Sequence, residues 1–495
     1  MSSVGTAVVA GVALRNAASA TDGASGSVDG KQDAAKASQA KPASAAAGSA
    51  DVIGAMFDGD DKREKFIPVT RQAVMERLAR SHYWSGSEAV HVRRFFRYLD
   101  YWRKQTYSAR LLDLEQTYEP FSPDSDLLIT RKFSAAERGH MQKRLVSQVE
   151  ELLVQANYTQ IDPDNVALIM TKDSHYGLDL FVDFKAFDEL SIFYRGATKR
   201  KETRRNIKKL YLLKEEFDVP IFQRICILFK LKPEAQHVQD LIKEKGCSEE
   251  AATKLVRRLR SALPPQVKSD LVYLKLFKNM PRSDIEMVFP NTKVKFRLFD
   301  KFKLGVTAGS GLGMGVFGTA GKIAVATNPI ALAGALVGLG GIAIRQAINF
   351  MNQKNKYMTT MAQNLYFHAM ADNRGVMTLL ADRAAEEDLK EEVLLYTVLA
   401  KEPVNRARLA EVDAAIEQYL LNTFGVNLNF DVEDALGRLM RDGIVTELPD
   451  GTLKTLPPAA AAVHIDVLWD KYLDELPDMT TTEGVEFELE PEGAA

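Results

Sequence analysis

The sequence has little of what usually reveals a chemical activity. Its 495 residues include only two cysteines, Cys226 and Cys247, which form neither a CxxC pair nor a zinc-binding pattern. So few thiols fit a reducing compartment and exclude a scaffold held together by disulfides. The formal net charge is −2, and so balanced a chain has no overall field that would attract nucleic acid. The length allows two to four globular domains.

Catalytic and cofactor-binding motifs are also missing. The seven histidines lie far apart, and neither an HExxH zinc motif nor a GxSxG nucleophile elbow is present. Gly313–Gly318 matches GxGxxG in form, but it lacks the preceding strand and the later acidic residue of a dinucleotide site. The sequence therefore predicts no catalytic, cofactor-binding or metal-binding residue. It favours a protein that is not an enzyme, without excluding one.

Both ends of the chain lack large apolar side chains. Residues 1–62 are rich in alanine and serine, and residues 477–495 are rich in glutamate. Such segments cannot bury enough apolar surface to fold, so both are predicted to be disordered. A mitochondrial transit peptide is normally rich in arginine and poor in acids, whereas the N-terminal segment has Arg15 as its only arginine.

Charge is almost absent from residues 304–344. These 41 residues contain one charged side chain, Lys322, and eleven glycines. A membrane-crossing helix needs roughly 20 mainly apolar residues. The run has the length of two such helices, with a helix-breaking turn at Thr327–Asn328–Pro329. It is therefore predicted to be a transmembrane helical hairpin.

Glycine recurs in both arms of this predicted hairpin. A four-residue spacing of small residues lets two membrane helices pack closely. The glycines assigned to this packing are Gly305, Gly309, Gly313, Gly311, Gly315, Gly334 and Gly338. Two alternatives stay open for the same residues: a glycine-rich hairpin buried in a soluble core, and one lying at an interface.

Basic residues flank the run on both sides. An excess of lysine and arginine marks the side of a membrane that is not crossed, and two crossings return the chain to its starting side. The flanking cations are Lys293, Lys295, Arg297, Lys301, Lys303, Arg345, Lys354 and Lys356. They predict a bacterial inner membrane location, or the mitochondrial inner membrane, with both termini in the cytoplasm or matrix.

Most of the remaining chain has helical or strand periodicity. We expect a helical region at residues 63–160, an α+β unit at 161–303 and a second helical region at 345–403. In the α+β unit the predicted elements are neighbouring strands at 178–184 and 190–194, strands at 272–277 and 294–299, and a helix at 248–263. In the second helical region, the helix predicted at 381–399 has a strongly charged face.

Residues 404–476 have the pattern of a winged-helix-like module. Helices are expected at 409–421 and 431–440, followed by a hairpin over 444–456 that turns at Asp450–Gly451. The second helix would read DNA in such a module, but its acids outnumber its cations, and phosphate contacts require cations. A protein-contact surface is therefore expected, and no nucleic-acid partner. The predicted fold class is an α+β membrane-anchored protein that is mostly helical.

The strongest local chemical feature is a basic run at residues 195–214. At helical spacing its cations form two adjacent rows beside an apolar stripe. Anionic headgroups attract such a helix by roughly 1 kcal/mol per basic residue. The alternative is a solvated face that pairs with carboxylates of the chain. The residues assigned to lipid-headgroup or other anion binding are Arg195, Lys199, Arg200, Lys201, Arg204, Arg205, Lys208 and Lys209.

Several segments resemble the poorly characterised family that includes the mitochondrial transmembrane protein 143 and many bacterial relatives. The matching segments are Phe66–Val69, Tyr118–Asp124, Ala156–Tyr158, Tyr194–Gly196, Tyr273–Pro281, Phe289–Pro290, Asn364–Phe367, Asp372–Gly375 and Phe430–Leu436. They spread across residues 66–473. The resemblance implies a membrane protein with a paired hydrophobic segment, and it assigns no reaction or catalytic residue.

These patterns favour a membrane-anchored scaffold or adaptor that binds proteins or anionic headgroups on the inner face. A membrane-associated enzyme with an unrecognised site is one alternative. An oligomeric pore built by the glycine faces is another, although no charged residue lies deep in either arm, where transport pathways place one. No cofactor is implied, and self-association is left open.

Overall fold

The structure is a computed structural model in which two compact units can be described. The described residues are 63–80, 83–126, 133–162, 178–205, 214–261, 263–264, 266–290, 293–296, scattered positions from 348 to 363, and 365–475. Unit 1 comprises the described residues of 63–159 and 373–475, and unit 2 those of 160–372. Unit 1 is thus built from two stretches of the chain that are distant in sequence.

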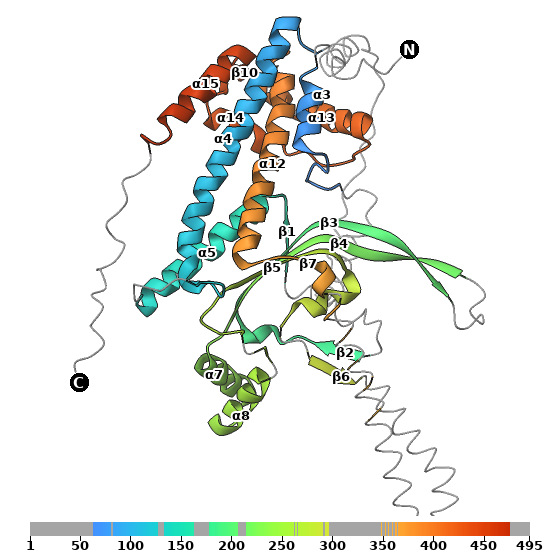
Figure 1. Cartoon of the computed structure of the whole chain (residues 1–495), viewed down its shortest axis with the longest axis vertical. Helices are drawn as coiled ribbons and strands as arrows, with labels where there is room; N and C mark the ends of the chain where they lie inside the picture. Colours follow the sequence, from blue (N-terminus) through green and yellow to red (C-terminus); the bar gives the residue numbers. More distant parts are fainter. Residues whose placement is uncertain are drawn as a thin grey trace, which may run out of the picture. The chain divides into compact units, whose positions relative to one another are not determined.

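Unit 1 is organised around two long helices that run side by side, α4 (Gly86–Tyr118) and α12 (Asn373–Leu399) (Figure 1). α3 (Arg71–Leu78) and α5 (Ala135–Gln155) pack against them. The helix starts follow from local sequence, because Ser85 with Glu88 and Ser134 with Glu137 form capping boxes. A short 3-10 helix, η1 (Glu119–Phe121), follows α4 at Pro120.

The C-terminal part of unit 1 has the element order predicted for a winged-helix-like module. Its three strands pair in the order β8-β10-β9, all antiparallel. The elements are β8 (Val404–Asn405), η5 (Arg406–Arg408), α13 (Leu409–Phe424), α14 (Val432–Arg441), β9 (Val445–Glu447), β10 (Thr452–Thr455) and α15 (Pro458–Lys471). Their apolar faces share one core with α3, α4 and α12, including Phe95, Tyr396, Leu420, Leu439 and Ile465.

Unit 2 contains a five-stranded sheet with strand order β1-β3-β4-β5-β7. The strands are β1 (Thr159–Ile161), β3 (Phe187–Arg205), β4 (Lys214–Leu231), β5 (Tyr273–Pro281) and β7 (Ala369–Asp372). A separate antiparallel pair joins β2 (Leu178–Phe181) to β6 (Lys293–Phe296). The remaining described elements of unit 2 are η2 (Phe184–Ala186), α7 (Glu234–Lys245), α8 (Glu249–Arg260) and η4 (Arg282–Val288).

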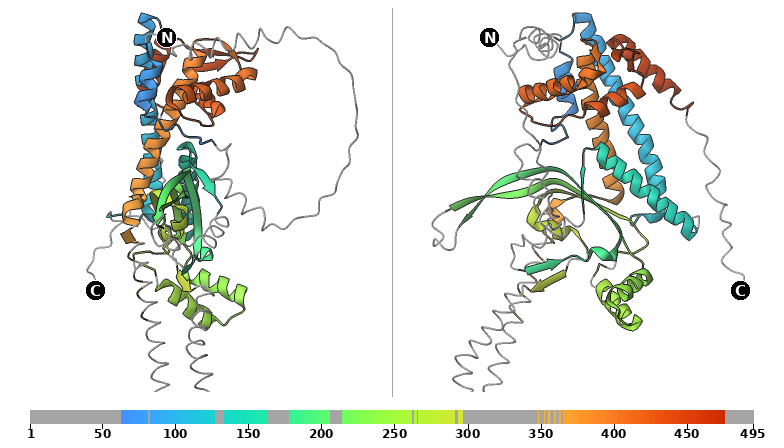
Figure 2. Two further views of the ribbon diagram at one scale, coloured as in Figure 1. Left: turned by 90° about the vertical axis from the view of Figure 1, so that its right-hand side faces the viewer. Right: turned by 180° about the vertical axis from the view of Figure 1, so that it is seen from behind.

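Strands β3 and β4 continue together beyond the rest of the sheet. Pairing between β4 and β5 ends at Ile221↔Pro281, whereas β3 and β4 stay paired out to Arg205↔Lys214. Figures 1 and 2 show this two-stranded part extending away from the other strands. We call residues 198–205 and 214–221 the distal ribbon. Gly196, at φ 76°, lies where the ribbon leaves the sheet.

Many predicted elements are confirmed. These include the helices at α4, α5, α8, α13 and α14, the strands β5 and β6, and the β9–β10 hairpin around Gly451. Strands β2 and β3 were expected to be neighbours, but β2 pairs with β6, and β3 pairs with β4. The β structure is also larger than predicted, because β3 and β4 run for 19 and 18 residues.

The prediction of a membrane-anchored fold with two spans is wrong for the part of the chain that the structure describes. No helix among the described residues is both long enough and apolar enough to cross a membrane. The apolar run at residues 304–344, with all seven glycines assigned to helix packing, lies outside the described residues. What the structure shows is an α+β fold with antiparallel sheets. The predicted location is not tested.

Candidate functional site

Helix α12 carries a run of charged side chains that are almost completely buried. Glu387, Asp388, Lys390, Glu391 and Glu392 each have a relative exposure of 3% or less. Charged residues are almost never this buried unless they are paired. The charged face of this helix therefore has to be neutralised by other elements of unit 1.

Two arginines from different helices supply most of that neutralisation. Arg438 of α14 contacts Asp388 at 3.2 Å (Nη1 to Oδ1), Glu392 at 3.0 Å (Nε to Oε1) and also Glu391. Arg103 of α4 donates from Nε to Glu392 Oε2 over 2.8 Å and pairs with Asp442, which follows α14. Glu392 thus lies between the two guanidinium groups, and the cluster links three helices.

Neutral donors complete the cluster. Tyr107 of α4 donates its hydroxyl to Asp388 Oδ2 over 2.6 Å, and Asn157 Nδ2 donates to Glu391 Oε1 over 3.0 Å. Asn157 follows α5 with a φ of 60°, a left-handed conformation that asparagine tolerates at a helix end. We call Arg103, Tyr107, Asn157, Asp388, Glu391, Glu392, Arg438 and Asp442 the charged cluster.

A second buried ion pair on α12, Lys390 with Glu387, binds the backbone of Ile67, which precedes α3. Lys390 Nζ donates to the Ile67 carbonyl over 2.6 Å and to Glu387 Oε1 over 2.9 Å. Glu387 Oε2 in turn accepts from the Ile67 amide over 3.0 Å. The Lys390–Glu387 pair therefore gives hydrogen-bond partners to both the N–H and the carbonyl of Ile67, a residue that belongs to no strand.

The charged cluster holds more carboxylates than arginines. Two guanidinium groups face Asp388, Glu391, Glu392 and Asp442. Burial raises the pKa of Glu391 to about 8 and that of Glu392 to about 7, against the opposing effect of the arginines. Burial also raises the pKa of Asp388. The cluster therefore retains protons near neutral pH, an electrostatic environment that often accompanies function.

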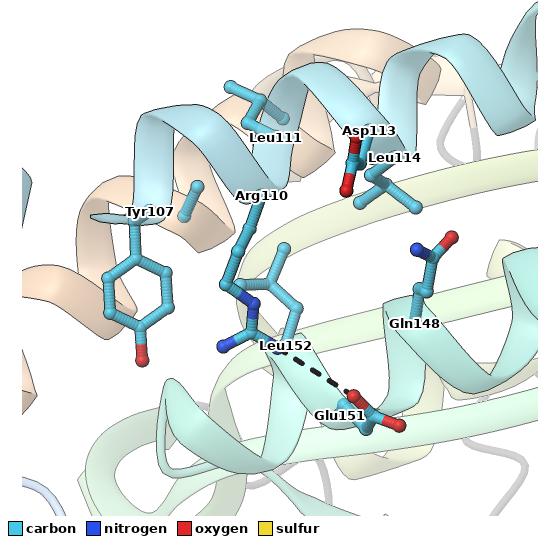
Figure 3. Close-up of a pocket in the computed structure, with 9 residues that line it drawn as sticks. Tyr107, Arg110, Leu111, Asp113, Leu114, Gln148, Glu151 and Leu152 are labelled. Carbon is cyan, nitrogen blue, oxygen red and sulfur yellow. Dashed lines mark ion pairs between the residues drawn. The ribbon is translucent and has the colours of Figure 1, made fainter. Parts of the chain in front are cut away.

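A pocket lies beside the cluster, between α4 and α5 (Figure 3). It has a volume of about 180 Å³, and Tyr107 belongs both to its wall and to the cluster. The lining residues are Tyr107, Arg110, Leu111, Asp113, Leu114, Gln148, Glu151, Leu152 and Ala381. No group of three or more His, Cys, Asp or Glu side chains with metal-binding geometry occurs among the described residues.

Six of the eight anion-binding residues predicted from the sequence are described, and they lie on a strand, so the predicted helix is wrong there. Arg195–Arg205 belongs to β3. Successive side chains of a strand alternate between its two faces. Arg200 and Lys201, which begin the two predicted rows, are therefore on opposite faces instead of adjacent ones. Lys199, Arg200 and Lys201 are exposed, while Lys208 and Lys209 lie outside the described residues.

The charged cluster was missed by sequence reasoning, although one signal of it exists. The end of α12, Val393–Leu399, is apolar apart from the Thr397 hydroxyl and the Tyr396 hydroxyl, and it is buried apart from Val398. A helix that is apolar all round is buried all round, so the acids one turn earlier had to be buried as well. Their partners cannot be read from the sequence, because Arg103 and Glu392 are 289 residues apart.

Fold and site together define an α+β protein in which a buried charged cluster joins α4, α12 and α14. Residues 187–375 match the family model described as "Protein of unknown function (DUF3754)". The chain therefore contains a DUF3754 domain, which runs from β3 to the first residues of α12. Nothing in that description connects it by name with transmembrane protein 143. No solved structure matches the chain.

Proposed function

We propose that the protein is a scaffold or adaptor, and that the distal ribbon binds an acidic segment of a partner protein. The observation that carries the proposal is the concentration of exposed cations on a ribbon that leaves its sheet. Lys199, Arg200 and Lys201 are exposed beyond the last pair between β4 and β5. Such a ribbon can present both of its faces to a partner.

The shape of the ribbon supports a binding role. A two-stranded antiparallel ribbon is only marginally stable in water, because neither face rests on a third layer. A partner segment that covers one face or adds to an edge would supply the missing burial and backbone pairing. The distal ribbon therefore gains stability on binding, as expected for a recognition element.

The charge distribution along the ribbon supports an acidic partner. In the strand register Lys201 is opposite Asp218, a pair of opposite charges that favours pairing of the two strands. Arg200 is opposite Val219 and Lys199 is opposite Pro220, so neither cation faces a carboxylate across the ribbon. An acidic segment would supply carboxylates to these exposed cations.

The acidic second helix of the winged-helix-like module argues against nucleic acid as the main partner. Its Arg438 is buried by carboxylates of α12, so it cannot reach a phosphate. The exposed positions of α14 are Glu433, Asp434, Gly437 and Arg441. This face offers little of the phosphate neutralisation that dominates nucleic-acid affinity.

The test uses the full chain and poly-L-glutamate as a model acidic polypeptide. We expect salt-sensitive binding that weakens at least about tenfold, or ~1.4 kcal/mol, when Lys199, Arg200 and Lys201 are all replaced by Gln. The matched control replaces Lys243, Lys245 and Arg258, three exposed cations on α7 and α8, and should leave binding unchanged. Equal loss in both variants would contradict the proposal. Tighter binding to a 20-base-pair DNA duplex, lost in the ribbon variant, would instead assign the ribbon to nucleic acid.

A further inference from the structure

Helix α4 presents an exposed cationic surface in its N-terminal half. At 3.6 residues per turn, positions 90, 93, 94, 97, 98 and 101 fall on one side of the helix, opposite the buried side chains of Val92, Phe96 and Leu99. That side carries three exposed arginines and two tyrosines: Arg93, Arg94, Arg97, Tyr98 and Tyr101. We call these five residues the α4 face.

The tyrosines hold two of the arginines in place. The Cζ atom of Arg94 lies 5.2 Å from the ring centroid of Tyr98, and Arg94 Nε donates to the Tyr98 hydroxyl over 3.1 Å. The Cζ atom of Arg97 lies 5.8 Å from the ring centroid of Tyr101. A guanidinium group that stacks on a ring is preorganised, and its remaining N–H donors can bind a carboxylate at two points.

The charge of the α4 face is not balanced by neighbouring acids. None of its three arginines makes an ion pair with a carboxylate among the described residues. The two acids nearest to them in the sequence are already engaged, because Asp100 accepts from Arg71 over 3.0 Å and Glu88 accepts from the Ser85 amide over 3.2 Å. Two of the arginines are four residues apart, and like charges at this spacing destabilise a helix. An acidic segment would relieve this repulsion.

The chain itself continues into an acidic segment beside this face. Helix α15 packs along α4 (Figure 1), and the ring of Tyr472, just after α15, meets Trp102 edge-on with centroids 5.8 Å apart. Trp102 continues the row of Arg94 and Tyr98 at four-residue spacing. Residues 476–495, which lie outside the described residues, follow Tyr472 closely and contain six carboxylates and no lysine, arginine or histidine.

The spacing of those carboxylates matches the α4 face. Residues 485–490 alternate apolar and acidic side chains. In an extended chain, alternate side chains are about 6.6 Å apart, and Arg93 and Arg97 are about 6 Å apart along α4. Length is also sufficient. Residue 486 is eleven positions after Glu475, a stretch that spans up to about 36 Å, and Trp102 and Arg94 are only about 12 Å apart along α4.

We propose that the acidic segment of residues 483–492 binds the α4 face of its own chain. Its glutamates pair with Arg93, Arg94 and Arg97, and any other acidic segment reaches the α4 face only in competition with it. This contact uses no residue of the distal ribbon, so it does not rest on the scaffold proposal.

The experiment is carbodiimide crosslinking of the full chain carrying Arg97→Lys. The introduced amine should become joined to Glu486, Glu488 or Glu490, as mapped by mass spectrometry, because the reagent couples an amine to a carboxylate that it contacts. The matched control is Arg144→Lys, at an exposed position of α5, which should give no crosslink to the acidic segment. No crosslink in the Arg97→Lys chain, or equal yields in both variants, would overturn the proposal.

The same crosslinks distinguish the other occupants. Products that join Glu486 or Glu488 to Lys199 or Lys201, in place of the α4 face, would assign the acidic segment to the distal ribbon. Products found only between isotope-labelled and unlabelled chains after mixing would place the segment on a second copy. Either result would overturn the proposed contact.

Arginine reactivity tests the contact without changing α4. Phenylglyoxal should modify the three arginines of the α4 face about fivefold faster when Glu486, Glu488 and Glu490 are all replaced by Gln, a change equivalent to roughly 1 kcal/mol of ion pairing. Arg144 should react at the same rate in both chains. Unchanged rates at all four arginines would overturn the proposal.

Discussion

At the scale of single residues, the most consequential side chain is Arg438. It reaches Asp388, Glu391 and Glu392 from one position on α14. Buried ion pairs add little net stability compared with apolar residues, but removing one partner leaves uncompensated charge in a medium that solvates it poorly. The contribution of Arg438 to stability is therefore measured by removing this one side chain from the cluster.

Replacing Arg438 by Met should lower the free energy of unfolding by about 3–5 kcal/mol. The loss should be smaller at pH 5 than at pH 8, because the stranded carboxylates can protonate at low pH. Urea unfolding at the two pH values measures both effects. Arg441→Met is the control, since Arg441 is exposed on the same helix and should change stability by less than about 0.5 kcal/mol. Similar losses in the two variants would contradict the assigned role.

The cluster also predicts how stability depends on pH. The pKa of Glu391 is raised by burial to about 8 and that of Glu392 to about 7, both from an ordinary carboxyl value of 4.5. Between the ordinary pKa of 4.5 and these raised values, the folded chain binds more protons than the unfolded chain. The free energy of unfolding must therefore fall as pH rises through this window. Arg103 and Arg438 stay cationic throughout, because the pKa of each is raised even against burial by the facing carboxylates.

We expect unfolding free energy to decrease from pH 5 to pH 8 by an amount on the order of 2–4 kcal/mol. Glu391→Gln removes one titrating group and should make this dependence shallower, whatever it does to absolute stability. Denaturant unfolding across the pH range checks both statements. A stability that is flat or increases over this window would show that the cluster does not hold its protons.

At the scale of secondary-structure elements, α13 and α14 offer a matched pair of glycines. Gly437 lies within α14, and Gly425 ends α13 with a φ of 69°. A Cβ added at either residue would meet nothing within 4 Å. The two sites thus have equal space and differ in backbone conformation, which is favourable for L residues only at Gly437.

Gly437→Ala should therefore stabilise the chain by about 0.5–1 kcal/mol, since alanine restricts the unfolded chain and has higher helix propensity. Gly425→Ala should destabilise it by about 1–2 kcal/mol, because the left-handed conformation is strained for any residue with a Cβ. Thermal or urea unfolding of both variants measures the difference. The same sign in both would contradict the backbone argument.

Elements defined by local pattern were predictable from the sequence, and those defined by distant partners were not. α14 has its Asp431 cap and apolar spacing within ten residues, and the β9–β10 hairpin has its Asp450–Gly451 turn. The basic part of β3 was taken for a helix because cations four residues apart share a face in a strand as well as in a helix. The pairing of β2 with β6 joins residues more than 100 positions apart, which no local signal specifies.

The candidate site shows the same division. The acids of α12 are visible in the sequence, and the apolar residues after them indicate burial. Their partners are not visible, since Arg103, Asn157 and Arg438 come from three other parts of the chain.

At the scale of the whole molecule, the chain combines a unit fixed by buried charge with a sheet that extends a cationic ribbon. The DUF3754 match at residues 187–375 includes the whole of β3 and β4. Partner binding by the ribbon is thus a property proposed for that domain.

The most direct measurement is amide hydrogen exchange of the full chain with and without poly-L-glutamate. Exchange should slow in peptides that cover residues 195–205 and 214–222, where the partner would cover the ribbon and restrain its opening. Peptides of α14 should be unaffected. Protection confined to α14 or to α7 and α8, with the ribbon exchanging as fast as before, would contradict binding through the ribbon.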